Sequence, residues 1–379
     1  MVAGSYTIVQ MLPELEAGGV ERGTLELGKH LVQQGHRSIV ISGGGRLVPQ
    51  LTSEGSEHVS WDVGRKSPLT LRFIPKLRKF LNREKVDILH LRSRVPAWVG
   101  FLAWKSLPEQ SRPHLITTFH GFYSINRYSA VMAKGEKVIA ISRIIAHHVQ
   151  EVYNVPPERI ELIYRGFDQK LFDPSSVPQD ILDYWRIRWN LPRDMSPIIM
   201  LPGRLTRLKG HDVFIRALKE IEELNWLAVC VGDADENPGY CNELQQLLAD
   251  LHLEDRVRFV GHCDTMAAAY LLADIVVSAT STRPEAFGRI AVEAQAMQRP
   301  VIASAQGGSM ETVSPGKTGW LVEPGNVQRL ANALREAIVN PDLCKDFGRE
   351  GRIWVLANFT TEKMCAQTLK VYHDIMSHE

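Results

Sequence analysis

The sequence has few cysteines, no long apolar run and almost no net charge. Its five cysteines, Cys230, Cys241, Cys263, Cys344 and Cys365, are odd in number and include no Cys-x-x-Cys pair. This spacing argues against a disulfide scaffold and against zinc or redox motifs, and it favours reduced thiols in a cytosolic protein. No run of about 18 apolar residues occurs, so a membrane-spanning helix is not expected. The first ten residues lack a basic leader and predict a first strand rather than a signal peptide.

The net charge of +1 hides an uneven distribution. Residues 1–168 carry 22 Lys and Arg against 15 Asp and Glu, whereas residues 169–379 carry 22 against 28. Such asymmetry indicates that the first half meets an anionic partner, although ordinary surface variation explains it equally well.

The pattern along the 379 residues predicts two α/β domains. Apolar, β-branched runs alternate with helical segments, and the alternation restarts near Pro197, which predicts two parallel sheets covered on both faces. We expect domains at residues 1–172 and 193–358, a linker at 173–192, and a closing helix within 359–379. The expected strands are 7–12, 38–42, 88–91, 114–119 and 137–141, then 198–201, 226–231, 257–260, 275–278 and 301–304.

Residues that suit a phosphate follow the first strand of each half. Ligands of parallel α/β sheets bind beyond the carboxyl ends of the strands. Gly18-Gly19 precedes a helix whose amides and dipole favour an anion, although a plain tight turn has the same sequence. Gly203-Arg204 and Lys209-Gly210 lie on one loop, where two cations can hold a diphosphate. A solvated charged loop is the alternative, as the neighbouring Arg207 illustrates.

Two carboxylates and a histidine complete the candidate set. Glu285 precedes a predicted helix, and Glu293 lies more than one turn inside it. Such carboxylates accept hydrogen bonds from sugar or ribose hydroxyls, and the amides from Phe287-Gly288 to Ile290 can meet phosphate oxygens. Ordinary surface acids are the alternative. His120 follows the strand at 114–119, a place where a histidine is more often structural than catalytic.

Several motifs occur in one order along nearly the whole chain. The most specific is Glu-x7-Glu, Glu285 to Glu293 within PEAFGRIAVE. The others are GGVER at 18–22, TFHG at 118–121, GRLTRLKG at 203–210, GGSMETV at 307–313 and GKTGWLVEPGN at 316–326. Together they resemble the group 1, or family 4, retaining glycosyltransferases. The resemblance implies the GT-B fold, in which two Rossmann-like domains with parallel sheets face an interdomain cleft.

The resemblance also implies catalytic roles. Arg204 and Lys209 would bind the donor diphosphate, Glu285 would bind hydroxyls of the donor sugar, and His120 would lie beside the reacting sugar. The closing helix would cross back to the first domain.

The same resemblance implies a larger set of donor-binding residues, with Gly19 presenting its amide to the diphosphate and Glu293 binding the ribose. This set consists of Gly18, Gly19, Gly203, Arg204, Lys209, Glu285, Phe287, Gly288, Ile290 and Glu293.

Two features depart from the family pattern or compete with it. The family often has Asn-Gly at the domain junction, where this sequence has Arg165-Gly166, so Arg165 has no implied role. Asp233-Ala234-Asp235 resembles a metal motif of the other major transferase fold, but we interpret it as a loop. We therefore expect neither a metal ion nor a cofactor, because the cationic loop would stabilise the leaving diphosphate.

The predicted activity is transfer of a hexose-type sugar from a nucleoside-diphosphate sugar to a hydroxyl of a glycan or lipid-linked acceptor. The resemblance implies retention and a place in bacterial cell-envelope synthesis, such as lipopolysaccharide. We expect a cytoplasmic protein, peripheral on the inner face of the membrane, with no nucleic-acid partner. The basic segment 65–85, with apolar residues at helical spacing, could contact anionic lipid or pack on the sheet. A sugar-nucleotide epimerase and a non-catalytic nucleotide-binding protein remain alternatives, and a dehydrogenase fits less well without Gly-x-Gly-x-x-Gly.

Overall fold

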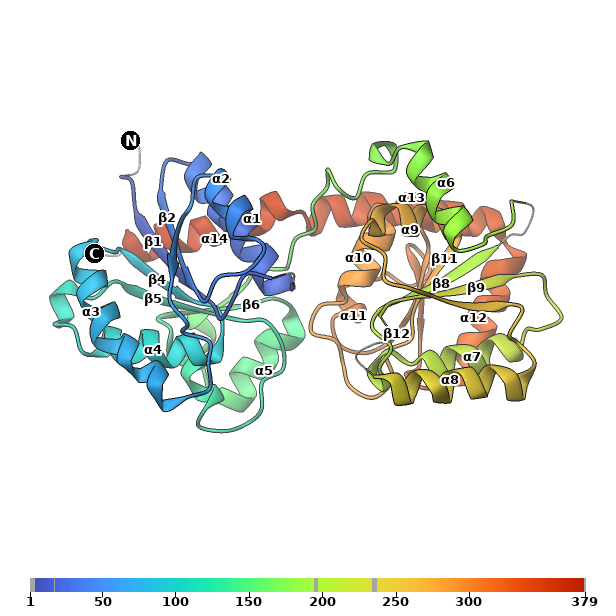
Figure 1. Ribbon diagram of the computed structural model, residues 1–379, viewed down its shortest axis with the longest axis horizontal. Coiled ribbons are helices and arrows are strands. Elements are labelled where there is room, and N and C mark those ends of the chain that lie inside the picture. The colour runs from blue at the N-terminus through green and yellow to red at the C-terminus, as the bar shows by residue number, and fades with distance from the viewer. Residues whose placement is uncertain (1–3, 17, 194–196, 234–236, 378–379) are drawn as a thin grey trace. The chain divides into compact units, whose positions relative to one another are not determined.

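The computed structural model describes residues 4–16, 18–193, 197–233 and 237–377 (Figure 1). The chain folds as two compact units. Unit 1 comprises residues 1–166 and 361–379, and unit 2 comprises residues 167–360. The second unit is therefore inserted into the chain of the first.

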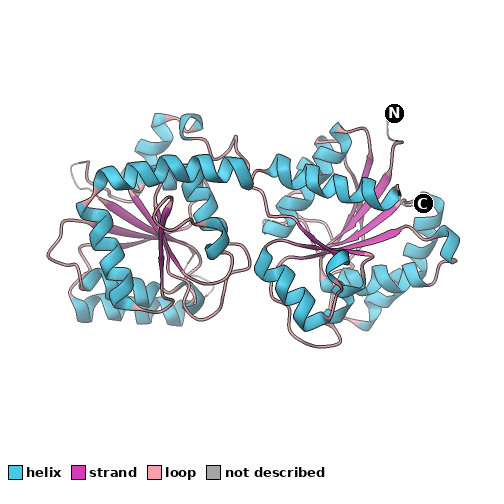
Figure 2. Cartoon of the chain, turned by 180° about the vertical axis from the view of Figure 1, so that it is seen from behind, coloured by secondary structure: helices cyan, strands magenta, loops and turns pink. Residues whose placement is uncertain are grey.

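Unit 1 is a parallel sheet with helices on both faces (Figure 2). Its described strands run in the order β3-β2-β1-β4-β5-β6-β7. Its elements are β1 (Thr7–Met11), α1 (Gly19–Gln33), β2 (Arg37–Ser42), α2 (Val48–Ser53), β3 (Glu57–Ser60), η1 (Pro68–Arg72), α3 (Phe73–Arg83), β4 (Ile88–Leu91), α4 (Arg94–Lys105), η2 (Glu109–Ser111), β5 (His114–Phe119), η3 (Ser129–Lys134), β6 (Lys137–Ala140), α5 (Arg143–Tyr153), η4 (Pro157–Arg159), β7 (Ile160–Leu162) and α14 (Thr361–Met376).

Unit 2 repeats this architecture, and its described strands run in the order β10-β9-β8-β11-β12-β13. Its elements are η5 (Pro174–Ser176), α6 (Gln179–Arg188), β8 (Ile198–Pro202), η6 (Arg207–Lys209), α7 (His211–Lys219), β9 (Leu227–Val231), α8 (Pro238–Leu251), β10 (Val257–Gly261), α9 (Met266–Leu272), β11 (Ile275–Ser278), α10 (Arg289–Ala296), β12 (Val301–Ser304), α11 (Ser309–Thr312), β13 (Gly319–Val322), α12 (Val327–Val339) and α13 (Pro341–Asn358).

The central strands form because their apolar residues are covered on both faces. Every residue of β4, β8, β9, β11 and β12 is buried. Sheets buried in this way are typical of parallel α/β folds, in which the connecting helices cover both faces. The predicted α/β fold class is confirmed.

The strand order places one reversal point in each sheet. In unit 1 the chain goes from β1 outward through β2 and β3, and then returns to pair β4 with the other side of β1. In unit 2 the same reversal lies between β8 and β11. The connections on the two sides of a reversal point leave a crevice at the carboxyl ends of the strands, where such folds bind ligands.

The last helix, α14, belongs to unit 1 rather than to the unit that precedes it in sequence. Cys365, Leu369 and Tyr372 of α14 join the apolar cluster that includes Ile8 of β1 and Leu31 of α1. Tyr372 also shares a 2.6 Å hydrogen bond with Nδ1 of the buried His90 on β4. Apolar burial and a buried hydrogen bond therefore attach this helix to the sheet of unit 1.

The units meet along the chain at Gly166–Phe167 and at Thr360–Thr361. Residues 173–192, interpreted from sequence as a linker, contain η5 and α6 and lie within unit 2. Trp185 on α6 is buried, and its ring centroid lies 5.3 Å from that of Trp189, with the two ring planes tilted by 48°. Pro174 begins η5, and Pro178 is the extended residue directly before α6.

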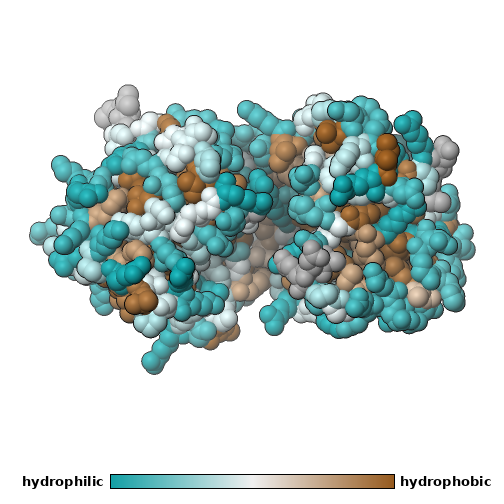
Figure 3. Space-filling view, in the orientation of Figure 1, coloured by the Kyte–Doolittle hydropathy of each residue, from teal (hydrophilic) through white to brown (hydrophobic). Residues whose placement is uncertain are grey.

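The basic segment 65–85 packs its apolar stripe into unit 1. Leu77, Phe80 and Leu81 of α3 are buried in the core, and Ile74 is half-buried. Leu71 lies outside α3, in η1, and is exposed. The stripe of α3 therefore faces protein and not lipid. None of the helices among the described residues combines the length and apolar character needed to cross a bilayer. Hydrophobic residues on the face in Figure 3 form separate small areas among hydrophilic ones.

Candidate active site

The loop from β8 to α7 brings Lys209 to the reversal point of unit 2. Gly210, which begins α7, has a φ of +69°, and a Cβ atom there would lie 1.9 Å from the carbonyl oxygen of Ala279 at the end of β11. Only glycine allows this approach. The amide of Ser281 donates to the carbonyl of Leu208 at 3.1 Å, so the loops after β8 and β11 are held together.

Lys209 and Glu285 form an ion pair across this reversal point. Their side chains are only 20% and 13% exposed. Thr280 donates a second hydrogen bond, of 3.2 Å, from Oγ1 to Oε1 of Glu285. A cation and a carboxylate at the carboxyl edge of the sheet can bind a phosphate and a sugar hydroxyl, respectively. The structure thus brings together two residues that the sequence places 76 positions apart.

The other cations of this loop lie differently. Arg204 follows Gly203 directly at the end of β8, and its side chain is exposed. Arg207 instead forms an ion pair with Glu243 and lies 4.9 Å from the ring centroid of Tyr240, both on α8. Arg207 is therefore directed toward a neighbouring helix, which separates it from Lys209.

Glu293 occupies a buried position inside α10. Only 8% of the residue is exposed. Its Oε2 accepts a 3.1 Å hydrogen bond from the hydroxyl of Tyr270, and Arg289, one turn earlier, pairs with Oε1. Burial and the neighbouring Glu293 carboxylate raise the pKa of Tyr270 well above its usual value, so the phenol remains a donor. The two carboxylates of the Glu-x7-Glu motif thus have different partners.

The glycine pair Gly307-Gly308 contacts the backbone at Glu285, where the loop toward Glu293 begins. Gly307 has a φ of +61°, and a Cβ atom there would lie 2.2 Å from the carbonyl oxygen of Glu285. The amide of Gly308 donates to that same carbonyl at 2.8 Å. Phe287 is buried, with its ring centroid 5.6 Å from that of Phe359.

The remaining donor-loop residues lie at the start of α10. Gly288 caps this helix, and Ile290 in its first turn is half-buried. The side chain of Phe287 therefore supports the loop, whereas the backbone beyond it begins a helix whose amides can face an anion.

Gly18 and Gly19 begin α1 in unit 1, as expected, but an acidic side chain accompanies them. The carboxylate of Glu21 folds back over the start of the helix, so that a Cβ atom on Gly18 would lie 2.2 Å from its Oε2. Burial raises the pKa of Glu21, although the amides of Gly18 and Glu21 act in the opposite direction. Glu21 lies within the GGVER motif, whose sequence alone predicts no role for this carboxylate.

His120 has a partner that sequence reasoning left without a role. The guanidinium of Arg165 donates to Nδ1 of His120 over 2.9 Å. Arginine has no acceptor, so Nδ1 carries the lone pair and the neutral ring carries its proton on Nε2. Burial lowers the pKa of His120 well below its usual value, and the charges of Arg165 and Arg92 and the neighbouring His90 add to this. The buried Nε2 has no partner among the described residues.

Two more polar residues lie at the reversal point of unit 1. Arg92 follows β4 directly, is only 6% exposed and donates to Oε1 of Gln10 on β1 at 3.1 Å. Its Nε has no partner among the described residues. The sequence contained a signal for these two residues. Gln10 lies inside an apolar strand and Arg92 directly follows another apolar strand, and burying such polar side chains costs free energy unless they have partners.

No group of three or more His, Cys, Asp or Glu side chains suited to a metal ion occurs within the described ranges. Of the Asp-x-Asp sequence, Asp233 is described and follows β9, whereas Asp235 lies outside the described residues.

The Arg165–His120 pair predicts a pH dependence. Because burial and the neighbouring charge of Arg165 hold the pKa of His120 well below its usual value, the native ring stays neutral at neutral pH, and no acid limb of activity from this group is expected near neutrality. Replacing Arg165 with Met removes the positive charge and the hydrogen bond, which raises the pKa toward its ordinary value. Because burial is the larger cause and remains in the variant, the pKa of His120 rises only in part. We expect about a tenfold lower kcat and an acid limb of activity at a higher pH than in the native protein.

The pH profile of kcat for the native protein, Arg165→Met and Arg165→Lys measures this effect. The Arg165→Lys variant keeps the positive charge beside His120, so its acid limb should lie at a lower pH than that of Arg165→Met. Identical profiles for all three proteins would contradict the assigned role of Arg165.

Both sheets and their crevices match the two-domain GT-B class of glycosyltransferases. A model of "Glycosyl transferases group 1" matches residues 183–354, and a model of "Glycosyltransferase Family 4" matches residues 17–171. A glycosyltransferase from Rickettsia africae has 35% identity, and the alignment covers 100% of both chains with a TM-score of 0.91. The chain belongs to the group 1, or family 4, glycosyltransferases, and the predicted enzyme class is confirmed.

Other relatives are more distant. N-acetyl-alpha-D-glucosaminyl L-malate synthase of Bacillus anthracis is 26% identical, over 96% of this chain and 95% of its own. D-inositol 3-phosphate glycosyltransferase 1 of Catenulispora acidiphila is 31% identical over 64% of this chain and 58% of its own. The HepE protein of Anabaena, crystallised with UDP-glucose, has 22% identity and a TM-score of 0.81 over 98% of this chain and 100% of its own, a likeness that concerns the fold.

Proposed function

We propose that this glycosyltransferase moves a hexose-type sugar from a nucleoside-diphosphate sugar to an acceptor hydroxyl, with retention at the anomeric carbon. The observation that carries the proposal is the Lys209–Glu285 pair at the reversal point of unit 2. It places a cation and a hydrogen-bond acceptor side by side, which are the two groups that a sugar diphosphate requires. The binding of UDP-glucose by the structurally similar HepE agrees with this choice of donor.

The proposed mechanism stabilises charge on the leaving group. As the bond to the anomeric carbon breaks, negative charge builds on the diphosphate and the sugar takes on oxocarbenium character. Lys209 and the exposed Arg204 would neutralise the diphosphate, and the amides at the start of α10 would contribute. Glu285, released from Lys209 by the donor, would hold hydroxyls of the sugar. Glu293 would hold the ribose.

The acceptor is proposed to be anionic. The first half of the chain carries the excess of cations, and the names of two relatives refer to L-malate and D-inositol 3-phosphate. Within this class we propose a lipid-linked or glycan acceptor of bacterial cell-envelope synthesis, such as lipopolysaccharide, used at the cytoplasmic face of the membrane. His120, with its proton on Nε2, would donate to the reacting sugar.

A screen of donors tests this function. The protein should hydrolyse slowly, or transfer from, one of the UDP-, GDP- or ADP-hexoses, and it should continue to do so in excess EDTA, because Lys209 and Arg204 would replace a metal ion. Release of the nucleoside diphosphate measures the reaction. Absence of turnover and of nucleotide binding with all donors would refute the proposal. Loss of activity in EDTA, restored by magnesium or manganese, would refute its metal-free form and redirect attention to Asp233.

A further inference from the structure

Two hollows lie beside α3 and α4 in unit 1. The first, of about 460 Å³, is lined by the segment before α3, by the first half of α4 and by Tyr128, and the second, of about 400 Å³, is lined by α3 and by residues that follow α4. Both volumes fall in the range of small-molecule sites. The two hollows differ in their lining residues, and the lining of the first makes it the candidate for a ligand site.

The first hollow has both apolar and basic residues in its lining. Leu71, Val95 and Trp98 are among the apolar ones, and Arg65 and Lys66 are the basic ones. No acidic residue is among the described residues that line it. This combination suits an amphiphile with an apolar chain and an anionic group.

The hollow adjoins apolar residues that remain exposed. Leu69 and Leu71 of η1 are 69% and 51% exposed, although their neighbour Thr70 is buried. Leu71 lines the hollow, so an apolar chain bound there would remove its side chain from water, which is favourable. The stripe of α3 does not explain these exposed residues, because that stripe is already in the core.

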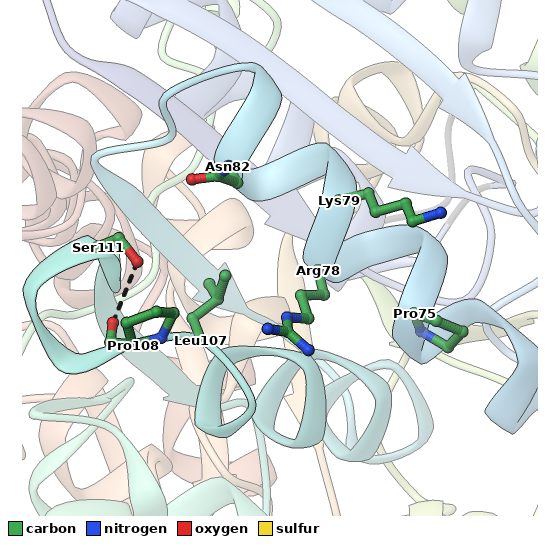
Figure 4. A pocket seen from close by; sticks show the side chains of 7 residues that line it. All are labelled: Pro75, Arg78, Lys79, Asn82, Leu107, Pro108 and Ser111. Carbon is green, nitrogen blue, oxygen red and sulfur yellow. Dashed lines mark hydrogen bonds between the residues drawn. The ribbon is translucent and has the colours of Figure 1, made fainter.

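The second hollow is a weaker candidate. Arg78 and Lys79 leave α3 in different directions, and the Ser111 hydroxyl donates to the Pro108 carbonyl within the lining (Figure 4). Like the first hollow, it has two cations in its lining, Arg78 and Lys79 on α3, which makes it a matched control for charge.

A series of contacts joins the first hollow to His120. Tyr128 lines the hollow, and its carbonyl accepts a 2.8 Å hydrogen bond from Trp98. The guanidinium of Arg94 lies 5.4 Å from the ring centroid of Tyr128 and 4.9 Å from that of Tyr123. The Tyr123 hydroxyl lies 3.5 Å from the amide nitrogen of His120, which donates to it. The residues that line the hollow follow β3, β4 and β5, and His120 also follows β5, so the hollow and the candidate reacting centre lie at the same edge of the sheet and are joined by these contacts.

We propose that the first hollow binds the lipid end of the acceptor, with an alkyl or prenyl chain on Leu71 and Trp98 and a phosphate at Arg65 and Lys66. This inference rests on the proposed function, since it names the acceptor class as a phosphate-bearing lipid. Arg65 pairs with Asp62 on the exposed surface and would exchange that partner for the phosphate. Lys66 is the other basic residue of the lining.

Binding of a brominated dodecyl phosphate to the full chain tests the proposal, with quenching of tryptophan fluorescence as the readout. Inorganic phosphate and dodecyl maltoside serve as the comparison probes, and both should bind at least about tenfold more weakly. Trp98→Phe should remove most of the quenching, because bromine quenches over contact distance. Quenching that is unchanged in this variant would overturn the assignment.

Two variants with matched controls test the chain and the phosphate separately. Leu71→Glu should weaken binding about tenfold, whereas Leu162→Glu, at another exposed leucine of unit 1, should leave it unchanged. Lys66→Glu should weaken binding about fivefold, whereas Arg78→Glu, in the second hollow, should not. If Lys66→Glu and Arg78→Glu lost the same affinity for dodecyl phosphate, binding would reflect general attraction to a basic surface, and the proposed site would be overturned. Equal binding of dodecyl maltoside would do the same.

The outcome is separable from that of the proposed function. Nucleotide binding by the native protein reports on the donor site alone. Nucleotide binding without dodecyl phosphate binding would reject the lipid site and leave a soluble anionic acceptor, whereas failure of nucleotide binding would reject the proposed function itself.

Discussion

Replacing Glu285 with Gln is expected to lower kcat by about 10²- to 10³-fold while the nucleoside diphosphate still binds. The neutral amide can no longer pair with Lys209, and it accepts hydrogen bonds from the sugar more weakly than a carboxylate does. The loss falls on kcat because the sugar carries its developing charge only in the transition state. Donor turnover at saturation and calorimetry with UDP, GDP and ADP measure the two effects.

Glu293 is the matched comparison, since it belongs to the same motif but has other partners. Glu293→Gln should weaken nucleotide binding itself by about tenfold, through loss of a charged acceptor for the ribose. Its pairs with Tyr270 and Arg289 show that it is held in place from within unit 2. If both variants kept near-native turnover and affinity, the assignment of the Glu-x7-Glu motif would be wrong.

Replacing Lys209 with Ala should also lower kcat about 10²- to 10³-fold, which is the effect of removing one preorganised charge donor from a transition state. Here nucleotide affinity should fall as well, because the diphosphate carries charge before the reaction begins. The variant also leaves Glu285 without its cation, so part of the effect reflects an unpaired carboxylate that is only 13% exposed.

Arg207→Ala is the control on the same loop. Arg207 bonds to Glu243 on α8, and its side chain is 63% exposed, so its removal should change kcat and affinity less than about twofold. A Lys209→Ala enzyme as active as Arg207→Ala would show that charge on this loop has no part in catalysis.

Central strands were predictable from sequence, whereas of the edge strands among the described residues only β10, expected at 257–260, was predicted. The expected strands at 88–91, 114–119, 275–278 and 301–304 coincide with β4, β5, β11 and β12. Each is a short run rich in apolar or β-branched residues that is buried on both faces. A continuous apolar run of this length predicts a buried strand. β3, β7 and β13, at the edges of their sheets, were missed as strands. Edge strands cover less apolar surface, and their sequences EHVS and IEL contain charged or polar residues.

The location of the candidate residues was predictable, but their partners were not. Loops after parallel strands meet at one edge of a sheet, so Lys209 and Glu285 could be assigned to one crevice from topology. That Lys209 pairs with Glu285 whereas Arg207 turns to α8 depends on side-chain directions set by tertiary packing. Arg165 illustrates the same limit, because its contact with His120 spans 45 residues and departs from the family pattern. Local periodicity contains no information on such contacts.

The insertion of unit 2 into unit 1 has a consequence for the order in which the protein matures on the ribosome. All residues of unit 2 are synthesised before α14, whose Cys365, Leu369 and Tyr372 complete the core of unit 1. The first sheet to be translated is therefore the last to be closed, and until then its strands lack the apolar cover and the Tyr372–His90 bond. A premature stop codon before residue 361 would leave the unit 2 sequence intact and expose the interior of unit 1 to chaperones and proteases.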